Sequence, residues 1–125
     1  MFSHIMVGTN DLDKAKTFYD GLLGSLGVPP ARVDGHRIFY MTPTGIFSVS
    51  KPINGEPATI ANGGTIGFAC SSTAQADAWH AAGVAHGGTA CEDPPGVREG
   101  SAGKLYLAYL RDPDGNKLCG LHRMA

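Results

Sequence analysis

The sequence predicts an α+β fold built from two similar halves, each consisting of a strand, a helix and further strands. The first observation is an internal repeat, because placing His4 over Thr65 aligns apolar residues at matching positions, including Phe18 with Trp79. The second is the turn sequence Pro-Asp-Gly-Asn at 113–116, which is typical of a hairpin between two strands. The third is the content of 18 glycines, which favours short elements and tight turns over long helices.

The first half is expected to begin with a strand at residues 4–8 and a helix from about 11 to 23. Apolar residues alternate along this strand, so every second side chain should cover the helix, while His4 and Met6 face the opposite way. The polar run at 9–11 offers N-cap oxygens for the helix. Strand patterns then follow near Val33, at 36–41 and at 46–50.

The second half is expected to repeat this pattern after a connection rich in Pro, Gly and Asn at 51–64. Its strand starts at Thr65, and Ser72 with Gln75 three residues later makes a capping-box signature. Gly83 is expected to end the helix in the left-handed conformation. Further strands are predicted at 89–91, 105–111 and 117–122, with a long Gly- and Pro-rich loop at 92–103.

The strand faces turned away from the helices suggest a ligand site. In the second half this face carries the small residues Thr65, Gly67 and Ala69, where a packed core would need bulk. Small side chains on a sheet leave room for a ligand. Alternation in the closing strand puts Cys119 and Leu121 on a common face, although this strand alone does not decide which face that is.

Composition limits the classes of function. The chain has 10 Lys and Arg against 11 Asp and Glu, and no run of basic residues, which argues against nucleic acid or an anionic membrane as a partner. No long apolar span or signal segment occurs, so we expect a cytoplasmic location. The cysteines Cys70, Cys91 and Cys119 are odd in number and lack CxxC spacing, which favours reduced thiols.

Several of these pieces together resemble a known family. The strand beginning with His4, the helix DLDKAKTFY, the second βα unit and the closing RDPDGNKL are similar to the vicinal oxygen chelate superfamily. This superfamily includes glyoxalase I, extradiol dioxygenases, and bleomycin and fosfomycin resistance proteins. The resemblance covers essentially the whole chain. It implies two βαβββ modules, about 1–55 and 62–125 of a single domain 1–125, whose mixed sheets form a cup-like, partly open barrel, and it implies a homodimer.

The resemblance also implies positions for a divalent metal such as Zn, Ni, Mn or Fe. The two first-strand positions fall on His4 and Thr65, and the two later ones on Ser48 or Ser50 and on Cys119. Of these, His4 is a good metal ligand and Cys119 could bind as a thiolate, whereas Ser and Thr hydroxyls are poor ligands for these metals. The metal site is therefore expected to be degenerate.

His4 is the candidate catalytic residue, since histidine can move a proton near neutral pH, although it could equally be a hydrogen-bonded residue that only lines the cup. Cys119 would need a lowered pKa to act as a nucleophile, and a buried, inert thiol is the simpler interpretation. Arg98 and Lys51 are candidate anchors for an anionic group of a ligand, or else ordinary surface charges. The expected substrate-binding residues are Met6, Phe39, Ser48, Ser50, Thr65, Gly67, Arg98, Tyr109 and Cys119.

Two kinds of function follow from these expectations. The first is a glyoxalase-like protein with a degenerate metal site that binds a small organic molecule and acts on it as a lyase or isomerase, as lactoylglutathione lyase does. The alternative is a metal-free protein that sequesters an antibiotic or another small molecule without catalysis. The missing carboxylate ligands count against the full metal-dependent mechanism.

Overall fold

The computed structural model describes residues 1–101 and 103–124, and its first half forms one helix and a four-stranded sheet, here called sheet A. The strand order is β1-β4-β3-β2, with β1 parallel to β4 and the other pairs antiparallel. The predicted strands and helix are confirmed. Their bounds are β1 (His4–Gly8), α1 (Leu12–Gly24), β2 (Arg32–Asp34), β3 (Arg37–Thr42) and β4 (Gly45–Ser50).

The second half repeats this topology in a five-stranded sheet, here called sheet B. Its order is β5-β9-β8-β6, with β7 also paired to β8, and β5 runs parallel to β9 as β1 does to β4. The repeat predicted from the sequence is thus present in the strand pairing. The elements are β5 (Ile66–Ala69), α2 (Thr73–Ala85), β6 (Thr89–Ala90), β7 (Gly96–Gly100), β8 (Gly103–Arg111) and β9 (Lys117–Arg123).

The helix starts follow the sequence signals, but the end of α2 does not. The Ser72 side chain accepts a hydrogen bond from the Gln75 backbone N–H at 3.0 Å, as the capping-box signature predicts. Gly83, expected to end the helix, lies inside α2 instead. A Cβ at this position would lie 2.5 Å from a methyl group of Leu110 in β8 and 2.9 Å from one of Leu22 in α1, so glycine allows α2 to pack closely on both. The positive φ belongs to Gly87, just after the helix.

The long loop predicted at 92–103 is wrong in part, because it contains β7. This strand pairs antiparallel with β8, with Arg98 opposite Leu105. Glycines stand at both ends of the segment, at 96 and 100, and Pro94 and Pro95 precede it. This composition is typical of a loop, so the strand is not evident from the sequence. The backbone hydrogen bonds to the long strand β8 stabilise β7, although its own residues have a low strand propensity.

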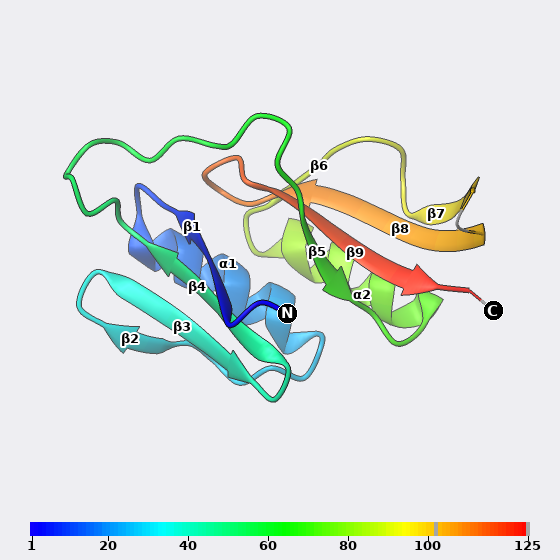
Figure 1. Ribbon diagram of the computed structural model, residues 1–125, viewed down its shortest axis with the longest axis horizontal. Coiled ribbons are helices and arrows are strands. Elements are labelled where there is room, and N and C mark those ends of the chain that lie inside the picture. Colours follow the sequence, from blue (N-terminus) through cyan, green and yellow to red (C-terminus); the bar gives the residue numbers. More distant parts are fainter. Residues whose placement is uncertain (102, 125) are drawn as a thin grey trace.

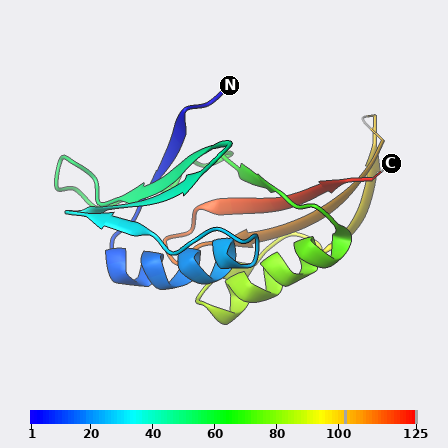
Figure 2. The same ribbon diagram turned by 90° about the horizontal axis from the view of Figure 1, so that it is seen from below.

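The two sheets lie next to each other, and each is covered by its own helix (Figure 1). Both helices lie on the same side of the sheets, and the opposite side carries no helix (Figure 2). Within the described ranges the sheets remain separate and do not close into a barrel, so the α+β class is confirmed with an open arrangement. No helix in these ranges is long and apolar enough to span a membrane.

One hydrophobic core runs through both halves. Aromatic rings connect them in series, with centroid distances of 4.9 Å from Tyr19 to Phe47, 5.3 Å from Phe47 to Phe68 and 6.1 Å from Phe68 to Trp79. Edge and tilted contacts at these distances stabilise aromatic pairs beyond simple burial. Trp79 and Phe18, which the repeat aligns, are both fully buried in this core.

A buried polar network also ties the halves together. The Tyr19 hydroxyl donates to Asp112 Oδ2 at 2.6 Å, and the Asn116 side-chain amide donates to the same carboxylate and to the Gly8 carbonyl. Burial, and then the charge of Asp112, raise the pKa of Tyr19 well above its ordinary value, so the hydroxyl remains a donor. The closing turn is thereby fixed against α1 as well as within its own hairpin.

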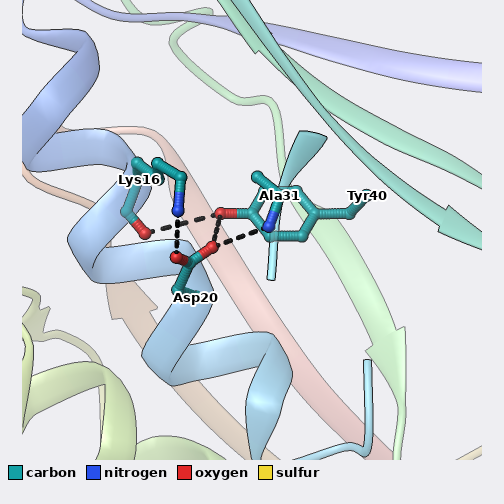
Figure 3. Close-up of polar contacts among 4 residues, drawn as sticks. All are labelled: Lys16, Asp20, Ala31 and Tyr40. Atoms are coloured by element: carbon teal, nitrogen blue, oxygen red, sulfur yellow. Dashed lines mark hydrogen bonds and ion pairs between the residues drawn. The ribbon is translucent and has the colours of Figure 1, made fainter. Parts of the chain in front are cut away.

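A second polar cluster holds the segment between α1 and β2 (Figure 3). Asp20 accepts from Lys16 Nζ at 2.6 Å, from the Tyr40 hydroxyl at 2.8 Å and from the Ala31 backbone N–H at 3.0 Å. Desolvation acts to raise the pKa of Asp20, but these hydrogen bonds outweigh it and lower that pKa below its ordinary 3.8. Asp20 therefore anchors the chain next to residues 26–29.

Candidate functional site

The sheet surface opposite the helices, here called the open face, carries most of the residues predicted to form a site. In sheet A the strand register places Met6, Ser48 and Phe39 in one row on this face, since their β3 neighbours Ile38 and Tyr40 are buried toward α1. In sheet B the register places Gly67, Cys119 and Tyr109 in one row on it. The two rows occupy equivalent positions in the two halves.

A groove of about 560 Å³ runs between the two sheets. Residues 26–29, which precede the Ala31 backbone bonded to Asp20, form part of its wall. Its sides include His4 and Met41 from sheet A, and Gly67 and Ala69 from β5. A Cβ built on Gly67 would meet no atom within 4 Å, so the space above this strand is empty of protein, as the small residues predicted. The volume suits a small organic molecule.

His4 lies at this groove with an exposed side chain. Its Nδ1 is hydrogen bonded to the Ser3 hydroxyl at 2.8 Å. No partner of Nε2 is found within residues 1–101 and 103–124, so one ring nitrogen is available to a ligand. A positioned imidazole of this kind can exchange a proton with a bound molecule.

The register decides between the two serines that the resemblance left open. Met6 pairs with Ser48 in sheet A exactly where Gly67 pairs with Cys119 in sheet B. Ser48 is therefore the equivalent of Cys119. Its hydroxyl is fully buried and donates to the Ile5 carbonyl at 3.0 Å, while the Ser50 hydroxyl donates to its neighbour's carbonyl at 2.7 Å. Both serine hydroxyls therefore donate their hydrogen bonds to backbone carbonyls of the protein.

Cys119 lies on the open face but is only 5% exposed. Burial raises the pKa of its thiol, and a hydrogen bond with Tyr109 opposes this shift without cancelling it. Beside it, Lys117 Nζ lies 5.1 Å from the centre of the Tyr109 ring and forms an ion pair with Glu92. The lysine charge is thus taken by a carboxylate, and the thiol is in its protonated form at neutral pH.

The residues at the four implied metal positions do not fit a metal centre. No group of three or more His, Cys, Asp and Glu side chains with the right geometry occurs within 1–101 and 103–124. The donor chemistry gives the same result, because Ser48 and Thr65 are hydroxyls and only His4 and Cys119 are metal-binding types. A catalytic zinc site usually has three protein ligands, so even His4 and Cys119 brought together across two subunits would be one short.

The two predicted anion anchors are not placed in the groove. The Arg98 guanidinium folds back along β7 and donates to the carbonyls of Asp93 and Pro94, at 3.3 and 2.9 Å. Lys51 is exposed at the end of β4, where the linker begins. Thr65 is exposed immediately before β5 and does not line the groove.

Arg37 is a residue of the open face that is not among the site residues predicted from the sequence. It begins β3 and shares the open face with Phe39 and Met41, the next two alternate residues of the strand. Side chains alternate along a strand, so the predicted strand at 36–41 already implies that these three residues share a face. Arg98 was a predicted anchor because Gly- and Pro-rich loops often carry binding residues.

Comparison with known proteins identifies relatives over the full length. The family model described as Glyoxalase/Bleomycin resistance protein/Dioxygenase superfamily matches residues 1–119. No curated protein matches the chain in sequence.

Solved structures include one of high identity. A glyoxalase/bleomycin resistance protein from Albidiferax ferrireducens is 63% identical with a TM-score of 0.97, the match covering 98% of this chain and 99% of that one. Two others share the fold at low identity. A glyoxalase-related enzyme from Fulvimarina pelagi is 18% identical (TM-score 0.75, covering 98% and 88%), and a lactoylglutathione lyase from Agrobacterium tumefaciens is 21% identical (TM-score 0.67, covering 98% and 92%).

Proposed function

Because this chain belongs to the glyoxalase/bleomycin resistance protein/dioxygenase superfamily, we propose that it binds a small organic molecule on the open face without using a resident metal. The proposal rests on one contrast: the chain forms a groove that could hold a ligand, but it lacks the side chains needed to bind a metal there. The groove and the bare surface above Gly67 provide space, whereas the metal positions carry two hydroxyls. Binding is the function that this combination supports best.

A homodimer in the cytoplasm is part of this proposal. In a single chain the open faces are unpartnered, and Met6 and Met41 are 43% and 50% exposed there. A second copy facing this surface would bury these methionines and complete the cup that the superfamily resemblance implies. The chain is then one domain with modules of about 1–55 and 62–125.

A fluorescence titration with phenyl-naphthylamine, an uncharged probe, in the presence of EDTA tests the proposed function. We expect saturable binding that EDTA does not change. Gly67→Phe should strongly weaken it, because the new ring enters the groove, while Ala81→Phe, which adds the same ring on the exposed side of α2, should not. Binding that disappears with EDTA, or that responds equally to both substitutions, would contradict the proposal.

A second candidate function is an isomerase or lyase in which His4 is the base. The Ser3 hydroxyl fixes Nδ1 of the ring, and Nε2 has no partner in the described ranges, which favours proton transfer at a carbon next to a carbonyl group. Deuterium exchange at such a carbon, followed by NMR with a bound ketone, would support this function if it is lost in His4→Ala. Equal deuterium exchange in the wild type and in His4→Ala would contradict this catalytic function, and ligand binding would then be the only proposed function.

A further inference from the structure

The open face of sheet A carries an arginine whose charge is not used by the protein. Arg37 forms no ion pair and no side-chain hydrogen bond with the residues in 1–101 and 103–124, and its Nε is buried without a partner. A buried N–H with no acceptor destabilises the folded protein, so such groups call for an explanation. The Nη groups of the same guanidinium are not buried and have no partner in these ranges, so they can bind an incoming acceptor.

The acidic residue nearest in the strand register does not supply that acceptor. Asp34 is directly opposite Arg37 in the β2–β3 pair, yet the two side chains do not come within ion-pair distance. On the other side Arg37 is opposite Ser50, whose hydroxyl donates to the Lys51 carbonyl. Arg32 adds a second exposed cation on the same face, opposite Phe39. The local charge is therefore positive and directed at the open face.

Apolar side chains continue from this charge along the same strand. Phe39 is half-buried and Met41 is 50% exposed, and both follow Arg37 at alternate positions of β3. At about 3.3 Å per residue, the row from Arg37 to Met41 is roughly 13 Å long. Met6 flanks it from β1, on the row that includes Phe39. A cation at one end of an aromatic and thioether surface matches a flat apolar molecule with one anionic end.

We propose that the ligand of the open face is an organic anion, with its carboxylate or sulfonate group on Arg37 and its apolar body over Phe39 and Met41. The planar guanidinium can bind both oxygens of such a group through its two Nη groups. This inference rests on the proposed function, since it names the class of ligand for the same surface. It places the anion anchor in sheet A rather than at Arg98.

Two fluorescent probes that differ by one charged group test the inference. Anilinonaphthalene sulfonate carries the anionic group, and phenyl-naphthylamine is its uncharged analogue. The dissociation constants of both are measured for the wild type, Arg37→Met, Arg37→Lys and the control Lys14→Gln, which removes one positive charge from the exposed face of α1. Thermal melting of each variant accompanies the titrations.

The wild type is expected to bind the sulfonate at least about tenfold more tightly than the uncharged probe, as charge-assisted hydrogen bonds require. Arg37→Met should abolish this preference while leaving the uncharged probe unchanged, Arg37→Lys should retain part of it, and Lys14→Gln should retain all of it. A preference that survives in Arg37→Met overturns the inference and leaves the proposed function standing. If neither probe binds the wild type, both are overturned. Equal weakening of both probes in a folded Arg37→Met counts as a surviving preference. If melting shows that Arg37→Met does not fold, Arg37→Lys decides: a sulfonate preference that is reduced but still measurable supports the inference, and an unchanged or absent preference overturns it.

Discussion

Adding one methyl group at each of two glycines in neighbouring strands should have opposite effects on stability. A Cβ at Gly120 would lie 2.7 Å from Cε3 of Trp79, a ring that is fully buried and has no room to move. Overpacking of this kind costs about 1–3 kcal/mol. A Cβ at Gly67 would meet nothing within 4 Å, and the residue has no positive φ. Gly67→Ala should therefore stabilise the protein by about 0.4–1 kcal/mol, by restricting the unfolded chain.

Urea unfolding at one fixed protein concentration measures both effects, with the single tryptophan as the fluorescent reporter. We expect Gly120→Ala to lower the free energy of unfolding by about 1–2 kcal/mol net, because the same entropic gain offsets part of the clash. The difference between the two variants should then be at least about 1.5 kcal/mol. Equal effects, or a larger loss for Gly67→Ala, would refute the assignment of Gly67 to the open face and Gly120 to the helix side.

Three other predictions concern charge, assembly and thiol chemistry. Because the Asp20 pKa is lowered in the folded protein, its contribution to stability is present above about pH 4 and is lost as the pH falls below that value. Asp20→Asn should therefore flatten the acid limb of a stability-against-pH curve, whereas Asp13→Asn at an exposed position of α1 should not. In light scattering, Met41→Glu should give a monomer and Val84→Glu a dimer, although the two side chains are similarly exposed, at 50% and 46%; a dimer in both variants would place the subunit contact elsewhere. Alkylation with iodoacetamide near neutral pH should modify Cys91 first, since the other two thiols are buried and their pKa values are raised, and rapid labelling of either of those would contradict the burial.

Most of the fold could be predicted because local signals and the repeat agree with the tertiary packing. The strand alternation at 4–8, the Ser72 and Gln75 capping box and the closing turn each determine their own element. The end of α2 could not be predicted, because Gly83 is explained by the close approach of β8 and α1 and not by helix termination. Strand β7 was missed for a similar reason, since its partner β8 and not its own composition makes it a strand.

The sequence predicts which residues of the candidate site share a sheet surface, but it does not predict which side chains interact with one another. Alternation placed Met6 and Gly67 on the surface away from the helices but left the face of Cys119 open, and the strand register places Cys119 beside Gly67. The sequence does not show whether a charge is free, which depends on neighbours brought together by folding. Arg98 is taken up by backbone carbonyls, whereas Arg37 has no partner within the described ranges, and only the structure distinguishes them.

Mapping a bound probe by amide chemical-shift changes in ¹⁵N-labelled protein tests the central claim most directly. We expect saturating anilinonaphthalene sulfonate to shift the amides of the open face, centred on β3 from Arg37 to Met41 and extending to His4 and Gly67. The exposed surfaces of α1 and α2 should show no comparable shifts. Saturable shifts confined to the helix side, or none at all, would contradict a ligand site on the open face.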